Sequence, residues 1–426
     1  MLVEFEVENY LSFRDKISFN FEKTLIRRCP EHVLQGKIPV LSGATIYGAN
    51  ASGKSNLFFS MKTVIKMINS DGNIAYLDFP RNKFMTIGDK PTYFSFVFQS
   101  EEHIYRYSFS ASFSKITEEA LYILDEKKAI KETIFERHEK NIKYGINTSE
   151  WYKYRTTTEF SLLLSKLKSD GVLERSEEEC TPYFRDVFSF FENFIFIINK
   201  DSKLENQQML YSSLQKDDFK TYLLDLLQSA DAGITGIQYQ RINNDATIPL
   251  LKAISKHPFS AKRFFLRGKD GNFYCGSKSN DELICEKLVL FHGNQEFDMQ
   301  QESEGTVKLM NLSLNFYIAK KVQKIILFID ELCSSLHPKL IEFLLKGIIK
   351  DFQNTHSQII TTSHDLYTLS EEFWRKDQIW FTEKEVSGNS VLTCLSDIDT
   401  RHDKSVFRSY LKGLYGGLPV LPIEAL

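Results

Sequence analysis

Apolar and polar residues alternate near the start of the chain. Apolar side chains occupy every second position over residues 3–7 and again over residues 17–21, with polar residues between them. A period of two is typical of half-buried strands, so this pattern predicts two strands joined as a hairpin. Two further runs, residues 93–98 and 104–109, are rich in aromatic residues and flank a polar turn. They predict a second antiparallel pair of strands in the same lobe.

A different pattern follows between residues 39 and 68. Residues 39–47 form a mostly apolar run typical of a buried strand, and apolar residues then recur at helical spacing from Leu57 to Ile68. The turn between them, residues 48–55, reads Gly-Ala-Asn-Ala-Ser-Gly-Lys-Ser. This sequence matches the phosphate-loop pattern, and it has the preceding strand and following helix that the pattern requires.

A phosphate loop binds polyphosphate through successive backbone N–H groups and the partial positive charge of a helix N-terminus. We expect Lys54 to reach the β- and γ-phosphates of ATP. We expect the hydroxyl of Ser55 to bind Mg²⁺, a cation that prefers oxygen ligands. The expected nucleotide-binding residues of this segment are Gly48, Ala49, Asn50, Ala51, Ser52, Gly53, Lys54, Ser55 and Asn56.

A second group of candidate residues lies far along the chain. Residues 325–329 are an uninterrupted apolar run that ends in Asp330 and Glu331. Such a run is typical of a buried parallel strand, and ligands bind at the carboxyl ends of these strands. We expect Asp330 to hold Mg²⁺ through water and Glu331 to act as the general base toward the attacking water. The alternative is an ordinary acidic turn, and the presence of a phosphate loop favours the catalytic interpretation.

Two segments on either side of these acids add further candidates. Residues 358–364 read as a strand that ends in Thr-Thr-Ser-His, which places His364 where it could donate a hydrogen bond to a γ-phosphate. Upstream, Ser303 and Gly305 open a helical pattern, so a serine hydroxyl and a helix N-terminus are available to an anion. Helices and strands alternate from residue 302 to residue 382, as expected for a parallel α/β sheet.

The composition changes over residues 116–290. Helical runs separated by polar connectors occur at residues 160–168, 183–191 and 218–228. No heptad pattern persists as a long coiled coil would require. Asn199 and Lys200 follow an apolar run and resemble part of the guanine-binding sequence of GTPases. The next residue is already the aspartate, where GTPases have an intervening position, so a strand end is the preferred interpretation.

Composition and charge limit the remaining possibilities. Lys and Arg total 53 against 56 for Asp and Glu, so the net charge is −3 and no whole-chain field attracts nucleic acid. The 6 cysteines are scattered without a CxxC pair, which argues against a disulfide framework or a zinc site. The N-terminus lacks the layout of a signal peptide, and no apolar stretch approaches about 18 residues. We therefore expect a globular, cytoplasmic protein with no membrane contact.

The order of these parts resembles a known protein family. The chain carries a phosphate loop, a long insertion, a Ser-x-Gly helix start, an apolar strand with Asp-Glu, Ser-Leu-His-Pro at residues 335–338, and a strand ending in His364. This order resembles the ABC-type ATPases of the SMC, RecF and OLD kind. More closely, the chain is similar to the stand-alone AAA-type ATPases of prokaryotic phage-defence and abortive-infection systems.

The resemblance implies an α/β fold of the ABC-type P-loop ATPase head, a mixed sheet with an antiparallel N-terminal lobe and a parallel core. It divides the chain into four parts. Residues 1–115 are the first part of the head, 116–290 a mainly helical insertion with some strands, 291–400 the second part of the head, and 401–426 a C-terminal tail. Gln99 is a candidate for the glutamine that connects the two lobes in this family.

The resemblance also implies how ATP is bound. Two heads form a homodimer, or part of a higher homo-oligomer, in which each ATP lies between the phosphate loop of one copy and the Ser303 and Gly305 helix of the other. Arg14 matches a basic position near the nucleotide in SMC-like relatives, and an exposed turn arginine is the alternative. OLD-type relatives carry a Toprim nuclease after the head; we expect none fused here, and therefore expect a separate effector protein, a Toprim- or HNH-type nuclease.

Three functions are compatible with these observations. The preferred one is a defence ATPase that uses ATP-dependent dimerisation to sense a trigger and control a separate effector. The second is a DNA-repair or DNA-binding head that acts on DNA directly, for which the basic, phenylalanine-rich run at residues 252–269 is a candidate surface. The third is a small-molecule kinase or a GTPase, which the incomplete guanine sequence and the Ser-x-Gly helix disfavour.

Overall fold

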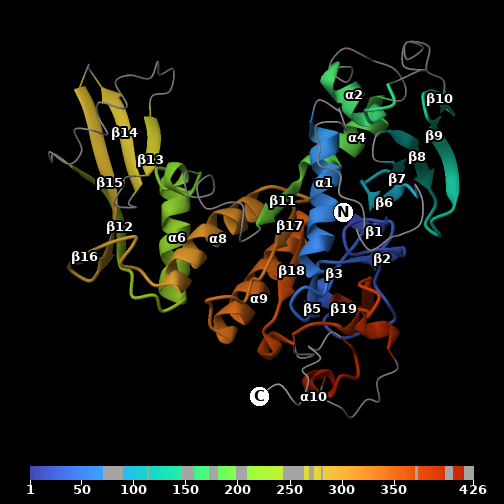
Figure 1. Cartoon of the computed structure of the whole chain (residues 1–426). Coiled ribbons are helices and arrows are strands. Elements are labelled where there is room, and N and C mark those ends of the chain that lie inside the picture. The colour runs from blue at the N-terminus through green and yellow to red at the C-terminus, as the bar shows by residue number, and fades with distance from the viewer. Residues whose placement is uncertain are drawn as a thin grey trace. The chain divides into compact units, whose positions relative to one another are not determined.

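The structure is a computed structural model in which the described residues fall into two compact units (Figure 1). The described residues are 1–70, 90–112, 115–145, 158–171, 181–197, 209–242, 263–267, 273–279, 282–369, 373–398 and 406–416. Unit 1 comprises Met1–Ile198, Val322–Ser334 and Ile341–Leu426, and unit 2 comprises Asn199–Lys321 and Ser335–Leu340.

The N-terminal lobe of unit 1 is a seven-stranded antiparallel sheet in the order β10-β9-β8-β7-β6-β1-β2. Its strands are β1 (Leu2–Glu8), β2 (Ile17–Asn20), β6 (Thr92–Gln99), β7 (Ile104–Ala111), β8 (Ile116–Leu124), β9 (Ile130–His138) and β10 (Asn141–Tyr144). In β1, Val3, Phe5 and Val7 are fully buried while the glutamates between them are partly exposed. The hairpin expected near the N-terminus and the second antiparallel pair are therefore confirmed.

The core of unit 1 is a six-stranded sheet in the order β11-β17-β18-β5-β19-β20. Its strands are β5 (Gly43–Gly48), β11 (Phe194–Ile197), β17 (Ile326–Ile329), β18 (Gln358–Ser363), β19 (Ile379–Lys384) and β20 (Ser390–Cys394). Every neighbouring pair is parallel except β19 with β20. The mixed α/β fold class, with an antiparallel lobe and a parallel core, is thus the one that the sequence predicts.

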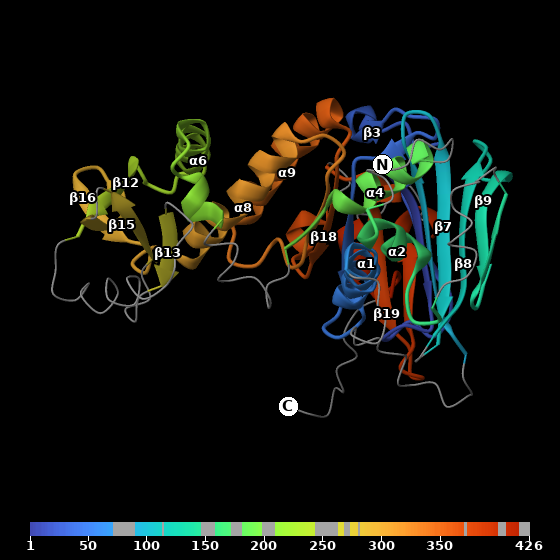
Figure 2. The same cartoon turned by 90° about the horizontal axis from the view of Figure 1, so that it is seen from above.

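One hydrophobic core joins the two sheets of unit 1. Helix α1 (Lys54–Asn69) lies between the core sheet and the antiparallel sheet in both Figure 1 and Figure 2. Its Phe58 packs edge-on against Phe328 of β17, with ring centroids 5.0 Å apart. Phe98 of β6 stacks on Phe190 of helix α4 (Thr181–Glu192) at 4.0 Å. Aromatic side chains therefore supply much of the packing between the layers.

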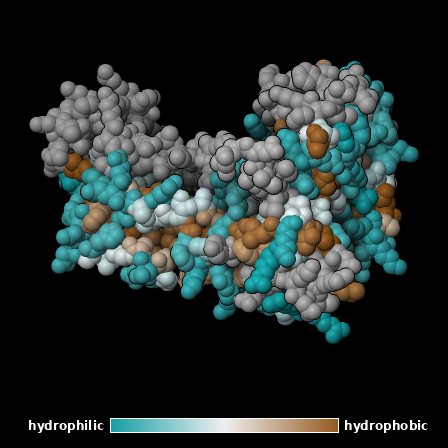
Figure 3. All heavy atoms as spheres, turned by 60° about the horizontal axis from the view of Figure 1, so that its bottom comes forward, coloured by the Kyte–Doolittle hydropathy of each residue, from teal (hydrophilic) through white to brown (hydrophobic). Residues whose placement is uncertain are grey.

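Several further elements complete unit 1. They are the strand pair β3 (Val33–Leu34) and β4 (Val40–Leu41), the helices α2 (Leu163–Ser169), α9 (Pro338–Thr355) and α10 (Val406–Leu411), and the 3₁₀ turns η1 (Pro30–His32), η5 (Leu366–Thr368), η6 (Lys376–Gln378) and η7 (Leu395–Asp397). The first three residues of α9 belong to unit 2. No described helix combines the length and apolar character of a membrane span. On the face in Figure 3, hydrophobic residues form separate patches among hydrophilic ones.

The described part of unit 2 contains a five-stranded sheet and the helices α6 and α8. The sheet contains β12 (Gly236–Arg241), β13 (Arg263–Arg267), β14 (Phe273–Ser279), β15 (Glu282–His292) and β16 (Gln295–Asp298), in the order β12-β15-β14-β13 with β16 on β15. Helices α6 (Asp217–Ser229) and α8 (Glu304–Lys321) contact each other through Phe219 and Tyr317, whose ring centroids lie 5.2 Å apart.

The expectation of a mainly helical insertion at residues 116–290 needs correction. The predicted helical runs form α2, α4 and α6, but the described residues of this stretch contain more strand than helix. Strands β8 to β10 extend the N-terminal sheet, and β12 to β15 build the sheet of unit 2. The signal was the alternation of apolar and charged residues, as in Ile-Thr-Glu-Glu-Ala-Leu-Tyr-Ile-Leu of β8, which has the period of a strand. Residues 199–201 and most of the basic run at 252–269 lie outside the described residues.

The close approach of β5 to β18 gives a test of the core sheet. A Cβ atom added at Gly43 would lie 2.6 Å from the carbonyl oxygen of Ile359, so Gly43→Ala must push two paired strands apart. We expect it to lower the free energy of unfolding by about 1–3 kcal/mol. The matched control is Gly347→Ala on α9, where nothing lies within 4 Å and alanine should stabilise the helix by about 0.5–1 kcal/mol. Urea unfolding of both variants measures the difference, and equal effects would contradict the packing at Gly43.

Candidate functional site

The predicted phosphate loop joins β5 to α1, and two glycines allow its path. A Cβ at Gly48 would lie 2.4 Å from the carbonyl oxygen of Thr382 on β19. Gly53 has a φ of 121°, which side-chain-bearing residues rarely adopt, and its added Cβ would lie 2.7 Å from Ser390 Oγ. Ser52 Oγ and Thr382 Oγ1 share a hydrogen bond of 2.6 Å that fixes the loop to β19. The loop is therefore held by contacts to β19 and β20, and it exposes Asn50 and Ala51.

Lys54 is the first residue of α1 and its side chain is nearly buried, at 5% exposure. Its Nζ donates to the carbonyl oxygens of Gly48 at 2.7 Å and Ala49 at 2.8 Å. Burial lowers the pKa of this amine to about 8, although Asp330 and Glu331 act in the opposite direction. Its two hydrogen-bond acceptors are neutral, so an anionic phosphate oxygen at the loop would be a stronger acceptor.

Ser55 and Asp330 bring together oxygen atoms from two distant segments. Ser55 Oγ donates to Asp330 Oδ2 at 3.0 Å, and Thr362 Oγ1 donates to Asp330 Oδ1 at 2.6 Å. Asp330 is 8% exposed, and it follows directly on β17. A carboxylate beside a hydroxyl is the all-oxygen donor set that Mg²⁺ prefers. The residues present therefore fit the metal expected from the sequence.

Glu331 and His364 lie next to this pair but are more open to solvent. Their side chains are 46% and 39% exposed, and His364 Nε2 lies 3.9 Å from Glu331 Oε1. Burial lowers the pKa of His364, and the nearby charge of Lys54 lowers it further, against the opposing effect of Glu331 and Asp330. The imidazole is thus favoured in its neutral form, which can donate one hydrogen bond and accept another.

The N-terminal hairpin contacts the start of α1, but Arg14 is paired elsewhere. Asn56 Nδ2 donates to Ser12 Oγ at 2.7 Å, so the hairpin is fixed beside the phosphate loop. The guanidinium of Arg14 instead forms an exposed ion pair of 2.8 Å with Asp15. A role for Arg14 at the nucleotide stays a prediction.

Ser303 and Gly305 belong to unit 2, whereas the residues discussed so far belong to unit 1. Ser303 caps helix α8, because its Oγ accepts the backbone N–H of Thr306 at 3.1 Å. The backbone at Gly305 packs closely against that of Ser335, since an added Cβ would lie 2.5 Å from the carbonyl oxygen of Ser335. The structure therefore brings Lys54, Ser55, Asp330, Glu331 and His364 together within unit 1, and the expected helix start belongs to unit 2.

Two features of the site differ from the sequence interpretation. Gln99 is buried, and its amide donates to the carbonyl oxygen of Ile38 and accepts its N–H, at 2.6 and 3.0 Å. It therefore holds the chain ahead of β4 and is not directed to the catalytic groups. The second feature is Thr362, whose contact with Asp330 the sequence interpretation missed. Its position two residues before His364, on the strand next to the acids, was the signal that could have indicated it.

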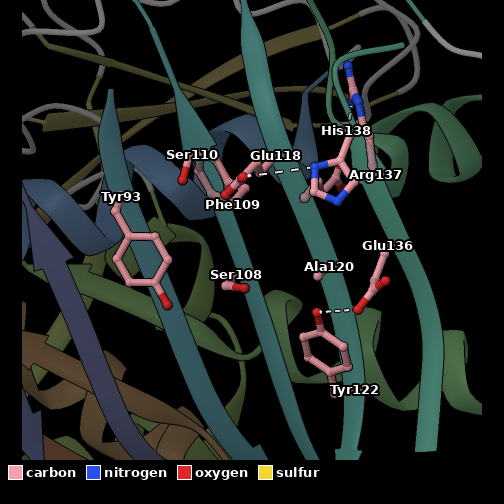
Figure 4. A pocket seen from close by; sticks show the side chains of 11 residues that line it. Tyr93, Ser108, Phe109, Ser110, Glu118, Ala120, Tyr122, Glu136, Arg137 and His138 are labelled. Atoms are coloured by element: carbon pink, nitrogen blue, oxygen red, sulfur yellow. Dashed lines mark hydrogen bonds and ion pairs between the residues drawn. The ribbon is translucent and has the colours of Figure 1, made fainter. Parts of the chain in front are cut away.

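A separate hollow of about 220 Å³ lies on the antiparallel sheet (Figure 4). Small residues, Ser108, Ser110 and Ala120, separate Tyr93 from the groups on β8 and β9. There, Tyr122 donates to Glu136 at 2.9 Å and His138 lies 3.9 Å from Glu118. None of the expected nucleotide-binding or catalytic residues lines this hollow.

Comparison with known proteins identifies the family of the chain. A protein family described as "AAA domain, putative AbiEii toxin, Type IV TA system" matches residues 44–370, which include the phosphate loop, both acids and His364. The chain belongs to this AAA-domain family. It therefore carries an AAA-type domain that spans the phosphate loop which the sequence predicts. Arg14 lies outside the matched segment.

Two solved structures of low sequence identity are similar to this member of the family over nearly its whole length. The SMC head domain from Thermotoga maritima is 12% identical, with a TM-score of 0.41 over 94% of this chain and 99% of that one. An SMC head bound to the C-terminal winged-helix domain of ScpA is 13% identical, with a TM-score of 0.43 over 93% and 98%. No curated protein matches the sequence.

Proposed function

We propose that this chain binds and hydrolyses ATP. The observation that carries the proposal is the meeting of Lys54 and Ser55 of the phosphate loop with the acids and His364 at one edge of the core sheet. Hydrolysis of a phosphoanhydride needs charge neutralisation and a positioned water rather than a covalent intermediate. The residues gathered here can supply both requirements.

Each residue has a role in this proposal. Lys54 and the N–H groups of the loop bind the phosphates, and Ser55 and Asp330 would hold Mg²⁺. The metal, when bound, neutralises charge on the phosphate oxygens. Glu331 is partly exposed, so it can reach a water molecule and accept its proton. His364 in its neutral form can donate a hydrogen bond to a γ-phosphate oxygen.

The wider function proposed is that of a defence ATPase that controls a separate effector. The family description names a putative toxin of toxin–antitoxin systems, which supports this class. In this proposal two copies dimerise around ATP, and Ser303 and Gly305 of one copy contact the nucleotide bound by the other. The exposed serine-capped helix start suits an anion. The rival proposal, direct action on DNA, relies on the basic run at residues 252–269, outside the described residues apart from strand β13.

The effector part of the proposal has a test of its own. Purification of the chain from its native host with ATP present should recover a Toprim- or HNH-type nuclease in fixed proportion. Recovery of DNA alone, with binding that weakens steeply as salt rises, would favour the DNA-acting alternative.

Removal of the loop lysine tests nucleotide binding. Lys54→Ala deletes the ammonium that is held at the phosphate loop, so we expect loss of ATP binding by about a hundredfold or more, because a preorganised charge for the phosphates is gone. Binding of a fluorescent ATP analogue measures the effect. The control is Lys66→Ala, an exposed lysine of the same helix, which should bind ATP as the unaltered chain does. Equal binding by the two variants would disprove the role of Lys54.

Glu331→Gln separates hydrolysis from binding. The amide keeps the shape of the side chain but cannot accept a proton, so we expect ATP binding to persist while turnover falls by about a hundred- to a thousandfold. Because bound ATP is then not consumed, a dimer should accumulate that light scattering detects. Glu342→Gln on α9, which removes an exposed ion pair with Lys346, provides the control and should leave turnover unchanged. Normal turnover in Glu331→Gln would remove the assignment of Glu331 as general base.

A further inference from the structure

Thr362 lies at the point where β17 and β18 stop pairing. The ladder between these parallel strands ends with Ile329 opposite Thr361, and the chain of β17 then turns at the two acids. Thr362 is completely buried, at 0% exposure. Because the ladder ends one residue earlier, Thr362 is the first residue of β18 that lies opposite the turn after β17 and not opposite β17 itself.

The side chain of Thr362 makes two hydrogen bonds, one to each acidic residue. Its Oγ1 lies 2.8 Å from the backbone nitrogen of Glu331 and 2.6 Å from Asp330 Oδ1. The backbone N–H can only donate, so the hydroxyl accepts there, and its own proton goes to the carboxylate. This is the only assignment of donors and acceptors that satisfies the Glu331 N–H group, the Thr362 hydroxyl and the Asp330 carboxylate together.

The turn held by this hydroxyl has an unusual backbone. Glu331 has a φ of 52°, a left-handed conformation that is uncommon outside glycine, asparagine and aspartate. A second bond, from the N–H of Leu332 to the carbonyl oxygen of Thr362 at 3.2 Å, holds the residue that follows. Thr362 thus holds the backbone on both sides of the glutamate's Cα, which fixes the direction of its side chain.

The same hydroxyl also sets the orientation of Asp330. Its donation to Oδ1 leaves Oδ2 on the side of the phosphate loop, where Ser55 Oγ lies at 3.0 Å. A continuous chain of hydrogen bonds therefore runs from the start of α1 through the Asp330 carboxylate and the Thr362 hydroxyl to the backbone of Glu331. The two oxygens that would hold Mg²⁺ and the residue that would activate water are linked through one threonine.

We propose that Thr362 is a positioning residue for ATP hydrolysis, which aligns Asp330 toward the metal side and Glu331 toward the attacking water. This inference rests on the proposed ATPase function. Thr362 acts through the two acids and has no direct part in the chemistry. Partners of this kind, which orient a metal ligand from behind, typically change metal affinity or activity by about 10- to 100-fold when removed.

The neighbouring residue provides a matched control. Thr361 is on the same strand, 2% exposed, and points to the opposite face of the sheet because side chains alternate along a strand. Thr362→Val keeps the branched shape and removes the hydroxyl, Thr362→Ser keeps the hydroxyl, and Thr361→Val makes the same chemical change on the other face.

The experiment measures kcat and KM for ATP, the Mg²⁺ dependence of fluorescent ATP-analogue binding, and the unfolding temperature of each variant. We expect Thr362→Val to lower kcat by about 10- to 100-fold and to raise the Mg²⁺ concentration for half-maximal binding by about tenfold. The KM should stay within about threefold, because the phosphate loop is intact. Thr362→Ser and Thr361→Val should both remain within about threefold of the unaltered chain.

Several outcomes would overturn the inference. A normal kcat in Thr362→Val, an equal loss in Thr361→Val, or a loss in Thr362→Ser as large as in Thr362→Val would each do so. If Thr362→Val fails to fold, Thr362→Ala and Thr362→Ser, which differ by one oxygen atom, replace the comparison, and equal kcat values in that pair overturn it. Failure of the proposed function would give a different result. The unaltered chain would then show no more ATPase activity than the Lys54→Ala variant.

Discussion

The parallel pairing of three strands from distant parts of the chain determines the candidate site. Strands β17, β18 and β5 lie side by side in the core sheet, and parallel strands end at the same edge. The phosphate loop follows β5, the two acids follow β17, and His364 follows β18. More than 270 residues separate Ser55 from Asp330 along the chain, yet their side chains are hydrogen-bonded. The proposed chemistry therefore requires this pairing register of the strands. Gly43 permits the register, because it has no side chain and lets β5 approach β18 closely.

The sequence predicted those parts of the site that depend on local pattern. The phosphate loop has a fixed spacing of glycines, and the acids follow an apolar run, so both could be located without knowledge of the contacts between them. Thr362 could not be assigned in this way, because threonine is common in strands for its shape alone. Its proposed function depends on register, which places it opposite the turn at Glu331. Some strands were expected in residues 116–290, but those of unit 2 were not located, since short alternating runs between helical segments carry a weak signal.

The two buried charges of the site, on Lys54 and Asp330, have neutral hydrogen-bond partners. Lys54 is nearly buried and bonded to two carbonyl oxygens, while Asp330 is nearly buried and bonded to two hydroxyls. Neutral partners satisfy the hydrogen-bonding groups of both residues but only partly offset the cost of burying their charge. A magnesium–triphosphate complex carries both signs, with anionic oxygens for the lysine and a cation for the aspartate. The residues that the site buries are thus complementary to the two halves of such a ligand.

Burial also differs between the residues according to the roles proposed for them. Lys54 and Asp330 lie below 10% exposure, whereas the side chains of Glu331 and His364 are 46% and 39% exposed. Binding groups gain from a low dielectric, because their attraction to phosphate and metal is screened less. A general base must instead reach a water molecule, so its carboxylate has to remain accessible while its backbone is fixed. The left-handed turn at Glu331 meets both needs, since it directs the side chain outward while the Thr362 hydroxyl holds the main chain in place.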